Sequence, residues 1–236
     1  MKPLACLALA VALALPAAAL AQDLSLDLGG EGSLTLRSAQ LIALLTVLSL
    51  APGIAVTVTC FPFIVTVLSI LRQAIGLQAS PPNMLIVSLA LFLTYFVMEP
   101  VATAAWDAGI GPLSRGEMDA ATAVPLAAEP FRAFMSNRVD ADTLAHLQAL
   151  RPAAEPGAFS VLIPSFLLSE ISRAFQIGFL VFMPFLIIDM VAAAILMSMG
   201  MMMVPPAIVS LPFKLAFFVV VDGWTLVSGA LVRSYL

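Results

Sequence analysis

Long apolar segments divided by short breaks make up most of the chain. Residues 38–71 contain no charged side chain, and as one helix they would exceed the roughly 30 Å hydrocarbon core of a membrane. Pro52-Gly53 interrupts this run, and proline cannot continue a helix. The pattern predicts a helix, a break and a second helix from about Val56, which open a first helical hairpin over residues 38–98.

The return arm of this hairpin follows a turn. Arg72 ends the apolar run, and residues 76–83 contain glycine and the pair Pro81-Pro82, a composition typical of turns. Met84 to Met98 is again apolar, and Glu99-Pro100 comes directly behind it. Because the residue before a proline is pushed out of the helical region, we expect the return helix to close at Glu99-Pro100.

Residues 99–158 differ in composition from the rest of the chain. They carry eight acidic and four basic side chains, and prolines and glycines punctuate them. We expect a small helical insert that faces water, with one helix over Pro130 to Met135 and a second that ends at Leu150. Asp140 and Asp142 supply side-chain oxygens that can cap the start of this second helix.

Residues 159–236 form the second apolar block, for which we predict another helical hairpin. Its arms run over Phe159 to Gly200 and Ala207 to Val232. Five of the protein's 12 methionines fall within residues 197–203, directly before Pro205-Pro206. Because the two prolines cannot continue the first helix, the pattern predicts a helix, a tight turn lined by methionine, and a second helix.

The methionines of this turn have two interpretations. Methionine is unbranched and polarizable, and in apolar helices it usually fills irregular gaps of the core. Met201, Met202 and Met203 lie in the turn itself, the part of a hairpin that its own chain is least able to bury. Deformable apolar side chains at this place favour a contact whose shape varies.

Charged residues interrupt the arms of the second hairpin. Glu170 and Arg173 are three positions apart, so they share a helix face and can neutralise each other. Asp189 and Lys214 lie at similar distances from the turn, and their heights in an antiparallel pair differ by about 4–5 Å. We predict that Asp189 pairs with Lys214, within one subunit or between neighbours. A proton relay is the functional alternative, because intramembrane acids often serve relays.

No partner for Asp222 is obvious in its own arm. It lies beside Gly223-Trp224, where a close subunit contact can cover it, so we expect Asp222 and Trp224 at such a contact. The uncharged runs of these arms are shorter than the roughly 20 residues that a lone membrane span needs. They are typical of helices packed mainly against other protein, and a chain so apolar implies an assembly.

The first 21 residues have the pattern of a secretory signal peptide. A basic residue precedes the apolar run Leu4 to Leu15, and Ala19-Leu20-Ala21 supplies the small residues of a cleavage site. Residues 22–37 are polar and acidic, and we expect a short periplasmic tail there. A cleaved signal peptide also places the insert outside the cytoplasm.

Composition narrows the class of protein. Of the 236 residues, 62% are hydrophobic and 10% are charged, against about 25% charged in ordinary soluble domains, which predicts a membrane-associated protein. The net charge of −4 gives a nucleic-acid partner no electrostatic support. His146 is the only histidine and is expected at the surface of the insert. Signal cleavage would remove Cys6 and leave Cys60 as a small core hydrophobe, so we expect no metal, cofactor or Ser/His site.

Specific motifs resemble the FliP family of flagellar type III export-gate proteins over residues 59–224. They occur in the family's order as Leu71 to Gly76, Pro81-Pro82-Asn83, Leu89 to Thr94, Ile163 to Phe166, Ser169-Glu170, Ala174 to Phe179, Pro184 to Asp189, Leu196 to Gly200, Met201 to Met203, Pro205-Pro206, Ser210 to Lys214 and Val221 to Trp224. Injectisome relatives resemble the same core, and the signal peptide and insert favour the flagellar branch. The chain departs from the family near Phe63, where an arginine is usual, and near Ser172, where a lysine is usual and Arg173 follows instead.

This resemblance implies a fold and a set of partners. FliP-like subunits form a pentamer, which FliQ-like and FliR-like subunits complete into a closed helical cone within the flagellar basal body. Much of that cone stands on the periplasmic side of the inner membrane, with FlhB-like and FlhA-like proteins below it. The expected fold is therefore all-α, with membrane-associated helical hairpins and a small periplasmic insert.

The resemblance also implies roles for particular residues. Unfolded flagellar proteins pass through the centre of the cone, and the three-methionine turn projects into the pore as a gasket. In this chain that turn is Met201, Met202 and Met203. Phe175 and Gln176 belong to one of the matched motifs, and we expect them at a subunit contact.

Two other classes of function fit some of the residues. A secondary transporter would use Asp189, Lys214 and Asp222 as coupling sites, but such proteins usually show inverted repeats, and the sequence shows no convincing one. An intramembrane hydrolase would need an aspartyl pair, which Asp189 and Asp222 supply only if they meet. We therefore expect a pore-forming export subunit rather than an enzyme.

Overall fold

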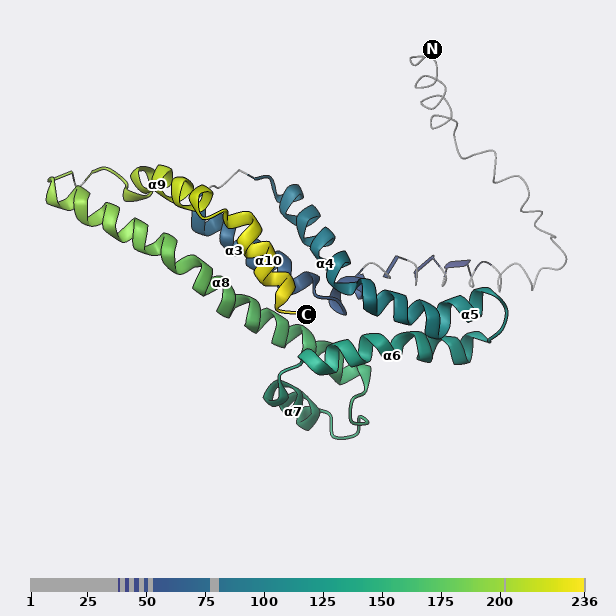
Figure 1. The fold of residues 1–236 in the computed structure, drawn as a ribbon. Helices are drawn as coiled ribbons and strands as arrows, with labels where there is room; N and C mark the ends of the chain where they lie inside the picture. Colours follow the sequence, from purple (N-terminus) through teal and green to yellow (C-terminus); the bar gives the residue numbers. More distant parts are fainter. Residues whose placement is uncertain are drawn as a thin grey trace, which may run out of the picture. The chain divides into compact units, whose positions relative to one another are not determined.

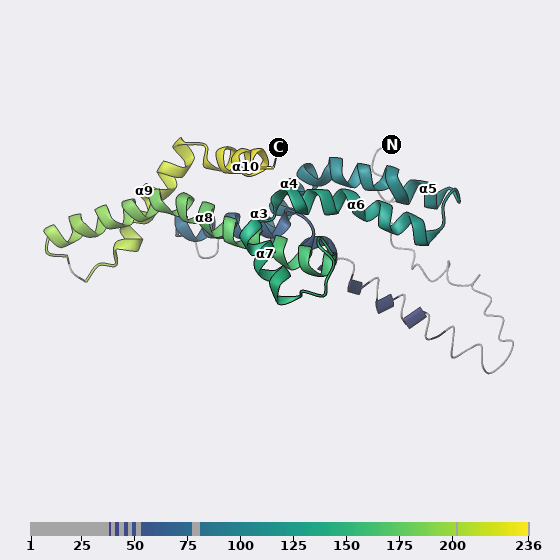
Figure 2. The same ribbon diagram turned by 90° about the horizontal axis from the view of Figure 1, so that it is seen from below.

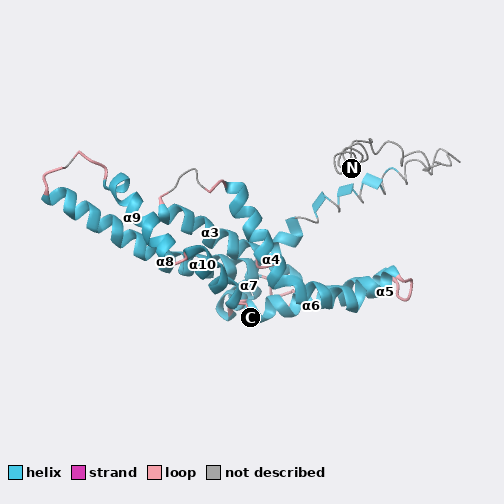
Figure 3. Ribbon diagram, turned by 45° about the horizontal axis from the view of Figure 1, so that its top comes forward, coloured by secondary structure: helices cyan, strands magenta, loops and turns pink. Residues whose placement is uncertain are grey.

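The structure is a computed structural model that describes residues 53–76, 81–201 and 203–235, together with seven positions between 38 and 50. The chain separates into two compact units, residues 1–51 and residues 52–236. The predicted signal peptide and periplasmic tail, residues 1–21 and 22–37, lie outside the described residues. Every regular element that the structure describes is a helix, which confirms the all-α prediction (Figure 1, Figure 3).

From residue 61 onward, the described part of the second unit contains eight helices and one short π-helix, most of which are labelled in Figure 1. They are α3 (Phe61–Ile75), α4 (Asn83–Ala105), the π-helix η2 (Trp106–Ile110), α5 (Gly111–Ser114), α6 (Ala120–Arg138), α7 (Ala141–Leu150), α8 (Phe159–Ser198), α9 (Pro206–Val220) and α10 (Gly223–Arg233).

The short helix α3 is the centre of the core. Its buried residues include Phe63 and Leu68, neither of which has any exposed surface. The long helix α8 lies against it. Gly178 of α8 permits this approach, because a Cβ at that position would lie 2.3 Å from Cδ1 of Ile70 on α3.

The start of α3 differs from the prediction. Residues 53–57 are helical, residues 58–60 form a break, and α3 begins at Phe61, so the predicted start at about Val56 is wrong. Pro62 occupies the first turn of α3, where its fixed φ suits a helix start and no backbone donor is lost. α3 therefore begins one residue before this proline.

The predicted end of the return helix at Glu99-Pro100 is also wrong. α4 continues through Pro100, and the helical run extends through η2 and α5 to Ser114. Buried side chains lie on both sides of the proline, among them Val97 and Ala105, and packing of this kind favours a continuous helix in spite of one missing hydrogen bond. The predicted boundary at residue 98 therefore lies inside a helix.

The main helix of the insert is longer than predicted. α6 covers Ala120–Arg138 rather than Pro130 to Met135, and it contains Pro125 as well. It runs back alongside η2 and α5 (Figure 1, Figure 2). A Cβ at Gly109 would lie 2.3 Å from the carbonyl oxygen of Ala123, so the two backbones approach closely only because residue 109 is glycine.

The second helix of the insert begins and ends where the sequence indicated. Asp140 is the N-cap of α7, and its Oδ1 accepts hydrogen bonds from the Thr143 amide at 2.9 Å and hydroxyl at 2.8 Å. Both donors favour the charged carboxylate and hold the pKa of Asp140 below its usual range. Asp142 follows in the first turn, α7 ends at Leu150, and His146 is exposed as predicted.

The two arms of the second hairpin differ in form. α8 is a single helix of 40 residues that continues through Pro164 and Pro184. The predicted single arm from Ala207 to Val232 is wrong, because α9 and α10 meet at a 61° bend (Figure 2). Asp222 lies between them with a φ of 48°, in the left-handed region that asparagine and aspartate tolerate best among residues with a side chain.

Two of the described helical runs are long and apolar enough to cross a membrane. They are Asn83–Ser114 and Phe159–Ser198, and α9 with α10 adds a third if the bent pair forms one span. This length and apolar composition agree with the membrane association that the sequence predicted.

Candidate functional site

The methionine turn joins α8 to α9 at one end of the hairpin (Figure 1, Figure 3). The Gly200 amide donates to the Met197 carbonyl at 3.1 Å, and the Met201 amide donates to the Leu196 carbonyl at 3.0 Å. Gly200 has a φ of 76°. These two bonds and the left-handed glycine are a Schellman motif, which ends a helix and satisfies its last carbonyls. Pro205 is then the N-cap of α9.

The side chains of the turn are only partly covered by their own chain. Met203 is 97% exposed and Met201 is 38% exposed, while Met202 lies outside the described residues. Methionine side chains so exposed do not fill a core within this chain. This geometry favours the interpretation of the turn as a contact surface.

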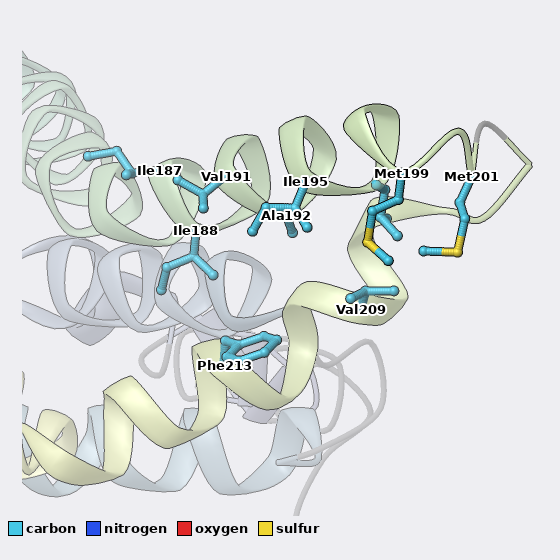
Figure 4. Close-up of a pocket in the computed structure, with 10 residues that line it drawn as sticks. Ile187, Ile188, Val191, Ala192, Ile195, Met199, Met201, Val209 and Phe213 are labelled. Atoms are coloured by element: carbon cyan, nitrogen blue, oxygen red, sulfur yellow. The ribbon is translucent and has the colours of Figure 1, made fainter.

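An apolar cavity of about 470 Å³ lies between α8 and α9, next to the turn (Figure 4). Met199 and Met201 face it from the end nearest the turn (Figure 4). The remaining lining residues are apolar and come from both helices: Ile187, Ile188, Val191, Ala192, Ile195, Leu196, Val209 and Phe213. The two helices are therefore loosely packed below the methionines.

Further along the same pair of helices, the structure brings Asp189 and Lys214 together within one chain. Lys214 Nζ lies 2.6 Å from Asp189 Oδ2 and donates a second hydrogen bond, of 3.1 Å, to the carbonyl oxygen of Ala74 at the end of α3. Lys214 is 5% exposed. The Ser210 hydroxyl donates to Asp189 Oδ1. The sequence alone predicted no role for this serine.

The structure also gives Glu170 more partners than the sequence suggested. Arg173 Nη1 lies 3.5 Å from Glu170 Oε1, but Arg138 Nε of α6 is closer, at 3.2 Å. The Tyr235 hydroxyl donates to Glu170 Oε2, and the Arg138 guanidinium lies 4.0 Å from the centre of the Tyr235 ring. Glu170 has no exposed surface, so its charge is compensated entirely inside the protein.

The residues expected at a subunit contact all lie on the surface of the chain. Phe175 is 61% exposed and Trp224 is 37% exposed, and Gln176 and Asp222 are also exposed. Trp224 packs edge-on against Phe218 with ring centres 5.3 Å apart. These positions are free within one chain to meet another protein.

The described part of the chain also contains residues that the alternative functions would use. It contains no set of three or more His, Cys, Asp or Glu side chains placed to hold a metal ion. Cys60 is free and fully buried, as expected of a core hydrophobe. Asp189 is engaged by Lys214 and Ser210, while Asp222 is exposed at the bend.

Comparison with known proteins places these features in a family context. The sequence model of the FliP family matches residues 44–231, a range that includes the insert, the buried charges and the methionine turn.

Several relatives carry the name flagellar biosynthetic protein FliP. The one from Caulobacter vibrioides is 52% identical, over 94% of this chain and 85% of the relative. The one from Agrobacterium fabrum is 46% identical, over 96% and 97%, and the one from Bacillus subtilis is 44% identical, over 83% and 91%.

Proposed function

This chain belongs to the FliP family, and from that premise we propose that it is a pore-forming subunit of a flagellar type III protein export gate. In this role it passes unfolded flagellar proteins across the bacterial inner membrane. A gasket of methionine side chains seals the pore when no substrate occupies it.

One observation carries the gasket role: the turn between α8 and α9 presents methionines that its own chain leaves exposed. Met203 is almost entirely accessible, and Met201 stands over an apolar cavity. Methionine has three rotatable side-chain bonds, so it adapts its shape to different neighbours at little cost. A ring of such turns closes on itself when empty and repacks around each residue of a passing chain.

The partners follow from the same proposal. Five copies of the chain form the pore with FliQ-like and FliR-like subunits, within the flagellar basal body and largely on the periplasmic side of the inner membrane. FlhB-like and FlhA-like proteins lie below and deliver unfolded substrates. Two membrane-length helices and a large exposed apolar surface on α8 support such an assembly.

Within this assembly the buried charges have a structural role. Asp189 with Lys214 and Glu170 with Arg173 neutralise one another, so apolar helices can carry them without exposing charge to lipid. Phe175, Gln176, Asp222 and Trp224 lie at contacts between subunits. No covalent chemistry is required of the chain, because the energy for export comes from other parts of the machine.

The decisive experiment replaces the methionines of the turn. Cells that express the complete gate with Met201→Ala, Met202→Ala and Met203→Ala should assemble it normally but leak ions, because alanine is too short to close the pore. Membrane-potential dyes and conductance of the purified gate in planar bilayers measure the leak.

The matched control replaces three methionines away from the turn: Met84→Ala, Met183→Ala and Met190→Ala. All three are exposed or half-buried in the single chain, so a general loss of methionine surface would affect both variants alike. A tight membrane in cells that hold the assembled turn variant would refute the gasket.

A further inference from the structure

The contact between α8 and α9 contains a cluster of three polar side chains. Asp189 of α8 accepts from the Ser210 hydroxyl through Oδ1 and from Lys214 Nζ, at 2.6 Å, through Oδ2. Ser210 and Lys214 are four positions apart on α9, so they lie one turn apart on the same helix face. We call these three residues the polar clamp.

The members of the polar clamp are shielded from solvent to different degrees. Ser210 has no exposed surface, and Lys214 is 5% exposed. The Ser210 hydroxyl has one hydrogen to donate, and its other acceptor within reach, the Ala207 carbonyl in its own helix at 3.2 Å, is the farther of the two. Asp189 is thus the natural acceptor, and both of its oxygens are bound from α9.

The apolar part of the interface does not fix how far α9 stands along α8. Hydrophobic contacts are non-directional, and the cavity of about 470 Å³ lies between these helices next to the turn. A slip of α9 by one helical turn, about 5.4 Å, exchanges one set of aliphatic contacts for a similar one. The same slip breaks both bonds of the polar clamp. It leaves the buried ammonium group of Lys214 without its carboxylate partner, which is strongly unfavourable.

The polar clamp also joins α9 to a third helix. Lys214 Nζ donates to the Ala74 carbonyl, 3.1 Å away, in the last turn of α3, where unpaired carbonyls and the helix dipole favour a positive charge. Gly76 lies directly beyond, and a Cβ there would be 3.9 Å from Lys214 Nζ. The lysine is therefore held from two helices, and Ser210 completes the bonding of the carboxylate that it faces.

We propose that Ser210 is a positioning residue: by holding Asp189 in place for Lys214, it sets the register of α9 on α8 and thereby the height of the methionine turn. Ser210 lies nine positions after Met201, and the loosely packed cavity lies between them. The turn can then deform, while the base on which it stands remains in one place. The consequence for sealing rests on the proposed function, but the register does not.

The register is tested first, by spin-label distances in the purified gate. The labels are attached at Met190→Cys on α8 and Ile208→Cys on α9, both of which are exposed in the single chain. The background variant is Cys6→Ser. Cys60 is fully buried and takes up no label. In gates that hold one doubly labelled copy among unlabelled copies, we expect one narrow distance for Ser210 and for Ser210→Thr, which keeps the hydroxyl. Ser210→Ala should broaden the distribution or shift it by up to about one helical turn, ~5.4 Å.

The control for the distance measurement is Ser198→Ala. Ser198 is an exposed serine close to the turn whose hydroxyl donates only to Ile195 of its own helix, at 2.7 Å. Its loss should leave the distance unchanged. A Ser210→Ala distribution that matches the wild type would overturn the proposal.

The second measurement reads the consequence in the pore. Gates with Ser210→Ala should assemble in normal amounts and leak ions, less than the triple-alanine turn variant does, and Ser210→Thr should restore the seal. One outcome separates the two proposals: the turn variant leaks, while Ser210→Ala shows a shifted register but no leak. In that case the methionines seal the pore, but Ser210 does not position them. If the turn variant itself is tight, the gasket fails, and the spin-label distances alone decide the register.

Discussion

At Glu170 three side chains, two of them from distant parts of the sequence, share one buried carboxylate. Arg138 comes from the insert, Arg173 from the next turn of α8, and Tyr235 from the end of the chain. A buried ion pair contributes little net stability compared with a well-packed apolar core, but removal of one partner is costly because the other charge remains. This cluster therefore ties the insert and the C-terminal residues to the long helix.

The first prediction at this scale concerns Arg138→Ala. It removes the ion pair with Glu170, the hydrogen bond of 2.7 Å to the Ser234 carbonyl and the contact with the Tyr235 ring. We expect a loss of about 3 kcal/mol or more, which for a chain of this size lowers the melting temperature by roughly 6–12 °C. Scanning fluorimetry of the detergent-solubilised protein measures the shift.

The control for this measurement is Arg115→Ala. Arg115 pairs with Glu117 at 2.7 Å, but both side chains are 57% exposed. Such surface pairs contribute little, so the melting temperature should not change. Equal melting temperatures for the two arginine variants would show that the Glu170 cluster does not hold the fold together.

Some of the buried polar contacts are predictable from the sequence and others are not, for a physical reason. Helix geometry connects residues three or four positions apart, and it connects the two arms of a hairpin through their distances from the turn. This geometry predicts that Asp189 pairs with Lys214, and in the structure Lys214 Nζ lies 2.6 Å from Asp189 Oδ2. Arg138 and Tyr235 reach Glu170 only through tertiary folding, 32 and 65 positions away, and no local pattern marks them.

At the scale of helices, proline rules mislead in apolar segments. Pro100, Pro164 and Pro184 lie inside apolar helices, although proline usually ends or kinks a helix in water. In apolar surroundings an interrupted backbone has no water to satisfy it, so continuation with one missing bond is the better outcome. Hydrophobicity therefore predicts where these helices lie, but the prolines within them do not mark their ends.

Our prediction at this scale uses two glycines with opposite surroundings. Gly109→Ala would place a Cβ 2.3 Å from the backbone carbonyl oxygen of Ala123, so η2 and α6 have to separate, and we expect a loss of about 1–3 kcal/mol. Gly229→Ala in α10 meets no atom closer than 3.6 Å. It should stabilise the protein by roughly 0.5–1 kcal/mol, because alanine favours helix.

Melting temperatures of the two glycine variants, measured side by side with the wild type, test this prediction. Opposite signs are expected, downward for residue 109 and upward for residue 229. If Gly109→Ala is tolerated as well as Gly229→Ala, the close contact between the π-helix and α6 is not a requirement of the fold.

For the molecule as a whole, the dominant feature is apolar surface that the single chain leaves uncovered. The long helix α8 contributes much of it, including Phe175, Phe179 and Ile187, each more than half exposed. Contiguous apolar surface of this kind marks a contact with protein or membrane. The composition predicts an assembly, but the helix face that is left uncovered becomes visible only when the helices are packed.

The prediction at this scale is that Phe175→Glu prevents assembly. A carboxylate in an apolar subunit contact is costly because it has no partner there, so the five-copy species proposed above should be lost. Native mass spectrometry of the chain purified with its co-expressed neighbours counts the copies. The control is His146→Glu on the exposed face of α7, which adds the same charge elsewhere and should assemble normally. An intact five-copy species with Phe175→Glu would show that this part of α8 is not at a subunit contact.

The 40 residues of α8 make a rod about 60 Å long, roughly twice the depth of the oily layer of a bilayer. Short spans are tuned to that depth, and each ångström of mismatch has a cost. A helix so long either tilts strongly or extends well beyond the layer, and in the proposed assembly neighbouring proteins cover the part that lipid does not. In that assembly a change of fatty-acid length in the membrane is expected to leave the position of α8 unaltered.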